Sequence, residues 1–232
     1  MSKLILGDGL LGLYLIESTD WNYISRKKDN IDFTDIDSYS KLLDSYDTIV
    51  NCIGISRSYE GDKSTYWNVN YKGVVDLVDL CNDTKKKLIH ISSDYVYAKS
   101  KPLASEDDVP VHCRNWYGYT KLLADGYIEL RSDNYLIART SFKSDSVYKE
   151  YEYGWMQFGN FDFVNVIGDM IINLIDLNVE GIYNVGTETK TLYDLFSVDN
   201  DSLKPTFNFP HESVPSNVTM NLNKVRSLYE RD

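Results

Sequence analysis

Short apolar runs rich in β-branched residues alternate along the chain with longer segments of helical spacing, and this alternation restricts the fold more than any other feature. The expected strands are Lys3 to Leu6, Trp21 to Ser25, Thr48 to Asn51, Lys87 to Ser92, Tyr135 to Arg139 and Gly181 to Val185. The expected helices are Leu10 to Glu17, Ser38 to Leu43, Thr65 to Cys81, Trp116 to Arg131 and Val164 to Leu177. Strands that alternate with helices form a parallel sheet covered on both faces. The sequence therefore predicts an α/β fold with a doubly wound parallel sheet.

The regular alternation fades after Arg139. Ser141 to Asp162 is polar and aromatic without a clear period, and Val198 to Pro215 is rich in loop-forming residues. We therefore expect a main domain over residues 1–140 and a small, reduced C-terminal subdomain over residues 141–232. The chain has only five prolines and no Pro/Ser-rich linker, so the two parts should be intertwined rather than tethered.

The charge balance excludes several classes of protein. Lys and Arg number 24 against 35 Asp and Glu, a formal net charge of −11, so we expect no nucleic-acid partner and no anionic membrane partner. The three cysteines are an odd number without metal-ligand spacing, which predicts neither a disulfide framework nor a metal site and favours a cytoplasmic location. No apolar run approaches the roughly 20 residues that span a bilayer.

A glycine motif follows the first expected strand directly. Gly7, Gly9 and Gly12 form a G-x-G-x-x-G that opens the first expected helix. Glycines allow a tight turn and close backbone approach, while free N–H groups at a helix N-terminus attract a pyrophosphate. Similar turns also serve plain strand-to-helix connections, but this one starts a βαβ unit. We therefore predict a Rossmann-like dinucleotide site whose contacts include Leu10 and Leu11.

The end of the second expected strand carries cations where NAD-binding proteins carry an acidic residue. Ser25, Arg26 and Lys27 offer a hydroxyl and positive charges, which would suit the 2′-phosphate of NADP because an Arg fork matches phosphate oxygens. A solvated basic turn on an acidic protein is the alternative. Asp35, a little further on, is expected at the adenine edge.

A tyrosine and a lysine share one face of the expected helix from Trp116. Tyr117 and Lys121 are four residues apart, and an ammonium beside a phenol lowers the tyrosine pKa so that the phenol can exchange a proton with a carbonyl or alcohol. Ser93, at the end of the fourth expected strand, would hold the same oxygen. Chance Tyr-x-x-x-Lys pairs are common among 19 tyrosines, so the order of the motifs along the chain carries the inference.

In this order the motifs resemble those of the extended short-chain dehydrogenase/reductases, and within them the dTDP-4-dehydrorhamnose reductase family. Ile91 to Tyr97 is similar to that family's Ser-Thr-Asp-Tyr-Val-Phe segment, and Asp47 to Ile53 to its Asp-x-Val-x-Asn-Ala-Ala segment. Arg139 to Phe142 is similar to Arg-Thr-Ser-Trp, and Gly181 to Gly186 to a Gly-x-Tyr-His segment. The resemblance runs nearly from end to end of the chain.

The resemblance implies an oxidoreductase that uses NADPH, with NADH as the second choice, to reduce the 4-keto group of a nucleoside-diphosphate 4-keto-6-deoxy sugar. It makes Ser93, Tyr117 and Lys121 catalytic, with Tyr117 protonating the C4 oxygen. It assigns further cofactor contacts to Cys52, Ile53, Gly54, Asn70, Thr140, Tyr117 and Lys121. It assigns substrate contacts to Ser56, Asp94, Tyr95 and Phe142. The expected partner is the nucleotide sugar, with a homodimer left open.

Departures from the family leave a second function open. The glycine turn is one residue shorter than usual, and Phe142 replaces a tryptophan that faces the sugar. A segment of about 20 residues, Lys143 to Phe163, replaces a longer insertion that closes over the nucleotide sugar. A non-catalytic, NADP-binding regulatory subunit of the same fold is therefore the alternative.

The shortened segment is rich in aromatic residues. Tyr151, Tyr153, Trp155 and Phe158 form either a flap over the sugar that orders on binding, or a lid pinned by its own packing. His90 ends an apolar strand and is expected to be a core residue. Neither His112 nor Cys113, in the loop before Tyr117, is expected to be catalytic.

Overall fold

A six-stranded parallel sheet forms the centre of the computed structural model, which describes residues 2–98, 100–108, 115–145 and 147–230. The strand order is β10-β5-β4-β3-β1-β2. The bounds are β1 Lys3–Leu6, β2 Asn22–Ile24, β3 Thr48–Asn51, β4 Lys87–Ser93, β5 Tyr135–Thr140 and β10 Gly181–Val185. Every predicted strand is present, and the prediction of a doubly wound α/β fold is confirmed. His112 and Cys113 lie outside the described residues.

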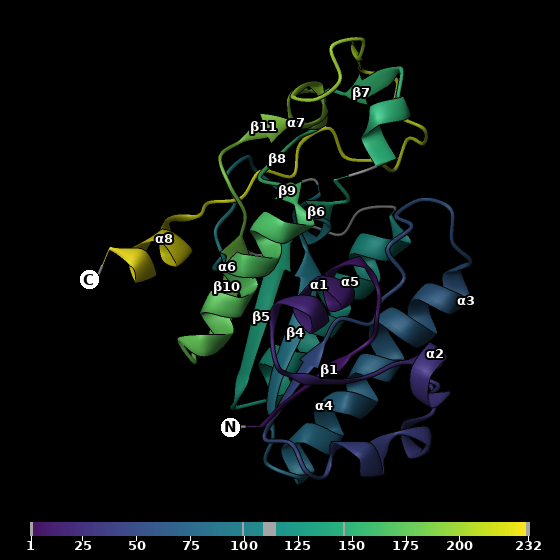
Figure 1. Cartoon of the computed structure of the whole chain (residues 1–232), viewed down its shortest axis with the longest axis vertical. Coiled ribbons are helices and arrows are strands. Elements are labelled where there is room, and N and C mark those ends of the chain that lie inside the picture. Colours follow the sequence, from purple (N-terminus) through teal and green to yellow (C-terminus); the bar gives the residue numbers. More distant parts are fainter. Residues whose placement is uncertain (1, 99, 109–114, 146, 231–232) are drawn as a thin grey trace.

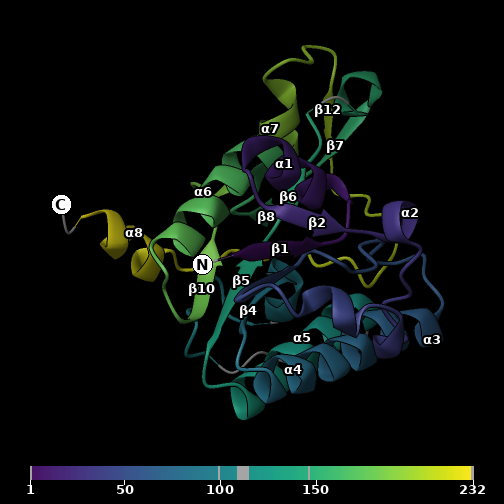
Figure 2. The same ribbon diagram turned by 60° about the horizontal axis from the view of Figure 1, so that its bottom comes forward.

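Helices cover both faces of this sheet (Figure 2). One face packs against α1 (Leu10–Ser18) and α6 (Val164–Asp176), and the other against α4 (Gly73–Asp83) and α5 (Trp116–Arg131). The helix expected over Thr65 to Cys81 is a run of α3 (Lys63–Tyr66), a π-helical stretch η3 (Trp67–Lys72) and α4. The sheet thus lies between two apolar clusters, which explains why its strands are buried on both faces.

One helix prediction was wrong. Ser38 to Leu43 forms parts of two short 3₁₀ turns, η1 (Ile36–Ser38) and η2 (Ser40–Leu43), and not an α-helix. The Asp35 carboxylate caps η1 by accepting a hydrogen bond from the backbone N–H of Asp37. Local side-chain capping of this kind favours short turns over a continuous helix.

Residues after β5 build a cap at one end of the sheet (Figure 1). Its small pieces are β6 (Phe142–Lys143), η5 (Val147–Glu150), β7 (Tyr153–Trp155), β8 (Phe158–Gly159), β9 (Asp162–Phe163), β11 (Lys190–Thr191), α7 (Leu192–Ser197) and β12 (Lys204–Thr206). They pair across the sequence as β6–β9, β8–β11 and β7–β12. A separate apolar cluster that includes Tyr148, Phe161 and Phe196 holds the cap together. Two elements that follow residue 140 belong to the main domain: β10 is a strand of the main sheet, and α6 packs on it. The domain boundary after residue 140 therefore stays a prediction.

The topology places a crevice at the carboxyl edge of the sheet. From β1 the chain proceeds outward to β2 on one side, whereas β3, β4 and β5 follow on the other. Loops that leave adjacent strands in opposite directions open a crevice, which is where open α/β sheets bind ligands. The short helices α2 (Arg26–Asp29) and η4 (Asp94–Tyr97) start at this edge, and α8 (Asn223–Tyr229) packs beside β10. Among the described helices, none is both long enough and apolar enough to cross a membrane.

Candidate active site

Two adjoining cavities lie at this carboxyl edge. The first, which we call the tyrosine cavity, has a volume of about 370 Å³ and is bounded by residues from the ends of β1, β3, β4 and β5 and from the start of α5. The second, the arginine cavity, has a volume of about 250 Å³ and lies between the glycine turn and the segment after β2. Gly9, Cys52, Gly54 and Ile55 line both cavities, so a single extended ligand can occupy the two together.

The glycine turn has the geometry of an anion site. Gly7 has φ of 97°, in the left-handed region, which favours glycine. A Cβ on Gly12 would come within 2.2 Å of the Gly7 carbonyl oxygen, whereas a Cβ on Gly9 would meet nothing within 4 Å. Gly9 is the N-cap of α1 and makes no side-chain cap, so the first N–H groups of α1 remain available to an anionic ligand.

The arginine cavity receives only part of the predicted set. Arg26 lines it. The Ser25 hydroxyl is buried and accepts a hydrogen bond from the Lys28 N–H as the N-cap of α2. Neither Lys27 nor Asp35 is among the described residues that line the two cavities.

Asp32, and not Asp35, is the aspartate of this segment among the described lining residues of the arginine cavity, so the contact of Asp35 with adenine stays a prediction. The Asp32 side chain lines the arginine cavity, and it accepts hydrogen bonds from the backbone N–H and the hydroxyl of Thr34. These bonds and the Arg26 charge lower the Asp32 pKa. Both aspartates lie in the same short segment. The Asp32 side chain lines the cavity, whereas the Asp35 side chain caps η1.

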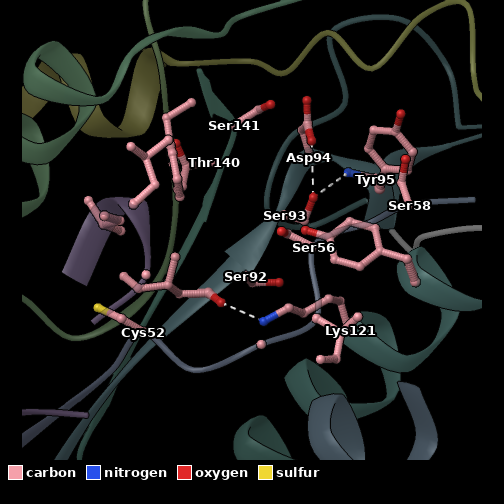
Figure 3. A pocket seen from close by; sticks show the side chains of 18 of the residues that line it. Cys52, Ser56, Ser58, Ser92, Ser93, Asp94, Tyr95, Lys121, Thr140 and Ser141 are labelled. Atoms are coloured by element: carbon pink, nitrogen blue, oxygen red, sulfur yellow. Dashed lines mark hydrogen bonds between the residues drawn. The ribbon is translucent and has the colours of Figure 1, made fainter. Parts of the chain in front are cut away.

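Ser93, Tyr117 and Lys121 all line the tyrosine cavity. Figure 3 shows Ser93 and Lys121 among the side chains around it. The Asn115 carboxamide caps the start of α5 by accepting a hydrogen bond from the Gly118 N–H. Ser93 ends β4, donates to Asp94 Oδ1 at 3.1 Å and accepts from the Tyr95 N–H. The Lys121 ammonium donates to the Ile91 carbonyl at 2.9 Å. The predicted catalytic group is therefore assembled from two elements.

The expected lowering of the Tyr117 pKa is wrong. Burial raises the pKa of the Tyr117 phenol, and the nearby Ser93 hydroxyl only partly offsets this. The Lys121 ammonium is hydrogen-bonded to the Ile91 carbonyl of β4. Burial also lowers the pKa of Lys121 to about 8, against the Asp125 carboxylate, which raises it. The pair therefore presents a protonated phenol beside an ammonium whose charge can be titrated near neutral pH.

The expected substrate end of the cavity holds a buried carboxyl group. Asp94 is 1% exposed, and burial raises its pKa to about 6. Tyr95 packs edge-on against Tyr117, with ring centroids 5.6 Å apart. Phe142 and Ser56 also line the cavity, as expected, and so does Lys143, which the sequence analysis did not single out. Its only local signal is its place directly after Phe142.

Two predicted residues shape the site from behind. Asn70, fully buried in the π-helical η3, accepts from the Ile55 N–H and donates to the Ile55 carbonyl. A Cβ on Gly54 would lie 3.2 Å from Lys121 Nζ and 3.4 Å from Asn70 Oδ1. Asn70 thus positions the loop after β3 instead of lining a cavity.

Two further predicted cofactor contacts line the tyrosine cavity, Thr140 at the end of β5 and Cys52 after β3. Burial raises the pKa of the Cys52 thiol to about 12 and keeps the thiol neutral.

Aromatic side chains of the segment from Lys143 to Phe163 contact aromatic residues from other parts of the chain. Tyr148 stacks on Phe196 with centroids 5.0 Å apart, and Trp155 contacts Tyr59 and Phe209. Tyr151, Tyr153, Trp155 and Phe158 are absent from the described lining of the tyrosine cavity. Tyr151, Tyr153 and Phe158 are exposed, so both the flap that orders on binding and the lid held by aromatic packing stay predictions. His90 is buried as expected, with Nδ1 3.3 Å from Asn51 Nδ2.

Comparisons with curated proteins find relatives that are reductases by name. A dTDP-4-keto-6-deoxy-D-glucose reductase of Streptomyces niveus is 28% identical over 142 residues, which are 58% of this chain and 49% of that protein. A probable low-salt glycan biosynthesis reductase, Agl14, of Haloferax volcanii is 30% identical over 117 residues, 48% of this chain and 39% of that protein. The chain thus spans about half or less of the length of the curated relatives it matches.

Solved structures share the fold over almost the whole chain. A hypothetical dTDP-4-dehydrorhamnose reductase from Sulfolobus tokodaii has a TM-score of 0.84 at 21% identity and covers 98% of this chain and 94% of its own. The dTDP-4-dehydrorhamnose reductase of Bacillus anthracis, in complex with NADP, has a TM-score of 0.84 at 21% identity and covers 98% and 93%.

A family profile also matches the sequence. The profile described as RmlD substrate binding domain matches residues 1–158, which include the glycine turn, both cavities' β-strand ends and the Ser93, Tyr117 and Lys121 group. It extends into the cap as far as Phe158. Because this match covers more than half of the chain, the chain belongs to the RmlD substrate binding domain family.

Proposed function

We propose that this protein is an NADPH-dependent reductase of the 4-keto group of a nucleoside-diphosphate 4-keto-6-deoxy sugar. The observation that carries the proposal is the meeting of Ser93, Tyr117 and Lys121 in a cavity that continues into the glycine turn. Relatives that are named dTDP-4-keto-6-deoxy-D-glucose reductase and dTDP-4-dehydrorhamnose reductase support the same chemistry.

The residues present fit a dinucleotide. The space at Gly9, the close approach of Gly12 to Gly7 and the uncapped start of α1 suit a pyrophosphate. Beyond the turn, Arg26 lines the arginine cavity and can distinguish a 2′-phosphate by charge. This arrangement favours NADPH, with NADH as the weaker choice. When bound, the reduced cofactor supplies the hydride.

The proton is supplied by the chain itself. Tyr117 has its phenol protonated at neutral pH because burial raises its pKa, so it can donate that proton to the C4 oxygen. Ser93, whose hydroxyl lies beside both Asp94 and the phenol, holds the same oxygen. Lys121 keeps its positive charge below its pKa of about 8, and this charge stabilises the phenolate left behind. Hydride at C4 and the proton on oxygen together give the alcohol.

The test is a reduction assay with a matched variant. Protein, NADPH and dTDP-4-keto-6-deoxyglucose should lose the absorbance of reduced nicotinamide, and Tyr117→Phe should lower kcat by roughly a thousandfold. Calorimetric titration with NADPH should give a dissociation constant for Tyr117→Phe within about threefold of wild type, because only the phenol oxygen is removed.

A flat absorbance trace with intact NADPH binding would contradict the reductase proposal and favour the non-catalytic regulatory subunit. That alternative makes use of the glycine turn, but it leaves the assembled Ser93, Tyr117 and Lys121 group without a role. A homodimer stays a prediction, which light scattering of the purified protein tests.

A further inference from the structure

Lys143 places a positive charge at the substrate end of the tyrosine cavity. It is the second residue of β6, whose pairing with β9 sets Phe142 opposite Asp162 and Lys143 opposite Phe163. Its side chain lines the cavity, and its Nζ lies 5.7 Å from the centre of the buried Phe161 ring. The strand pairing therefore holds this lysine at the cavity wall rather than leaving it at the surface.

The Lys143 ammonium has hydrogen-bonding capacity to spare. It carries three donors, and its only hydrogen-bond partner among the described residues is the Ser141 hydroxyl, at 3.4 Å. None of the ion pairs in the described part of the chain includes Lys143, although the charge of Asp94 influences its pKa. A partly buried cation with unused donors is stabilised when a ligand oxygen accepts from it.

Asp94 has the complementary unused capacity. One of its carboxylate oxygens, Oδ1, accepts from Ser93. The other, Oδ2, is buried and has no partner with hydrogen-bond geometry among the described residues, although Ser141 is close enough to lower the Asp94 pKa. Both Asp94 and Lys143 line the same cavity. An unpaired buried carboxylate oxygen requires a donor, which the substrate can provide.

A hydroxyl group fits between these two side chains better than an ion does. It accepts from the ammonium through a lone pair and donates its proton to the carboxylate. A substrate anion would be repelled by Asp94, and a substrate cation by Lys143. The part of the cavity lined by Asp94 and Lys143 therefore suits a neutral hydroxyl group of a sugar.

The position of Ser93 identifies which hydroxyl. Ser93 binds Asp94 Oδ1 directly, so a carbonyl oxygen held by Ser93 is next to Asp94. In a 4-keto-6-deoxy hexose, the carbon on one side of C4 bears the C3 hydroxyl, whereas C5 bears the methyl group and the ring oxygen. Building on the proposed function, we propose that Lys143, together with Asp94, clamps the C3 hydroxyl and makes the enzyme select sugars that retain it.

The experiment compares two substrates across two variants. The substrates are dTDP-4-keto-6-deoxyglucose and its 3-deoxy analogue, and the variants are Lys143→Met, which keeps the length of the side chain, and Lys149→Met, an exposed lysine of η5. Wild type should favour the 3-hydroxylated substrate by at least roughly a hundredfold in kcat/KM, since a buried polar site rejects a ligand that leaves it unpaired.

Lys143→Met should lower kcat/KM for the 3-hydroxylated substrate by roughly tenfold or more and change that for the 3-deoxy analogue by less than about threefold. The preference should therefore shrink in this variant and stay unchanged in Lys149→Met. Equal losses with both substrates would overturn the clamp. If dTDP alone also bound more weakly to Lys143→Met, the lysine would be a diphosphate contact instead.

A binding measurement separates failure of the clamp from failure of the proposed function. The reduced sugar nucleotide and its 3-deoxy counterpart can be titrated calorimetrically into the NADP-loaded protein, without turnover. If wild type reduces neither ketone but binds the 3-hydroxylated ligand more tightly, and Lys143→Met removes this difference, then only the reductase proposal falls. Equal binding of the two ligands by wild type would overturn the clamp.

Discussion

The glycine-turn side of the site and the cap are built by different means. On the first side, long-range parallel pairing of β1, β3 and β4 fixes the ends of the strands, and the functional groups follow within a few residues. In the cap, two-residue strands pair across gaps such as Lys190 with Gly159, and an aromatic cluster supplies the cohesion. Backbone geometry dictates the first region, whereas side-chain packing decides the second.

The largest expected effect would test whether the cap is prepacked. Phe161 is 1% exposed and central to the cap cluster, so Phe161→Ala should lower the free energy of unfolding by about 3 to 5 kcal/mol. Urea denaturation measures this change. In wild type, proteolysis within residues 143–163 should be equally slow with and without a nucleotide sugar. If a nucleotide sugar strongly suppresses cleavage within residues 143–163, the segment is a mobile flap and the cap is not prepacked.

A pH-dependent stability change is expected from Asp94, at the junction of the two regions. Its pKa is about 6 in the folded protein, against an ordinary value of 3.8 for an aspartate, so the folded state binds this proton more tightly than the unfolded state. The stabilising contribution is complete below the unfolded pKa and is lost as pH rises through about 6, on the order of 2 to 3 kcal/mol.

Denaturation measured from pH 4 to pH 7 checks this, and Asp94→Asn should flatten the slope. Burial also raises the pKa of Asp125, which pairs with Arg139 at 2.9 Å, and lowers the pKa of His90. These two groups contribute slopes of opposite sign, so the Asp94 contribution is the difference between wild type and Asp94→Asn. An unchanged slope in Asp94→Asn would show that Asp94 titrates normally in the folded protein.

Two glycine variants test whether backbone geometry dictates the first region. The Cβ of Gly12→Ala would be 2.2 Å from the Gly7 carbonyl oxygen, whereas that of Gly9→Ala would meet nothing within 4 Å. Gly12→Ala should therefore lower the free energy of unfolding by about 1 to 3 kcal/mol, as overpacking does. Gly9→Ala, the matched control, should change it by less than about 1 kcal/mol. Equal effects of the two changes would contradict the close packing of the turn.

An effect of similar size is expected on cofactor preference from Arg26. NADPH should bind more tightly than NADH, and Arg26→Ala should narrow this gap by about 1 to 3 kcal/mol, the worth of a charge-assisted hydrogen bond. Lys27→Ala is the control, since Lys27 is not among the described lining residues of the arginine cavity. Calorimetric titration of both nucleotides gives the comparison. If wild type bound NADPH and NADH with equal affinity, the basic turn at Arg26 and Lys27 would be a solvated surface turn with no role in cofactor choice.

Strands and most helices of the main sheet could be predicted from the sequence because their signals are local. A strand buried on both faces carries a short apolar run, such as Ile49 and Val50 in β3 or Leu88 and Ile89 in β4. The α5 boundaries match the prediction from Trp116 to Arg131 because Asn115 caps its first turn. The cap gave no such signal, since strands of two residues cannot show a period.

At the site, the sequence alone determined the identities and order of the reactive groups: the glycine turn, Ser93, and the Tyr117 and Lys121 pair. Only the tertiary structure decided their pKa values and the side chains that surround them. Burial raises the pKa of Tyr117, which local spacing predicted to be low. Among the described residues, Asp32 and not Asp35 lines the arginine cavity. The pairing of β6 with β9 brings Lys143 to the cavity that Asp94 also lines. Spacing along one helix is a local property, whereas desolvation and side-chain partners depend on segments that meet only in the folded chain.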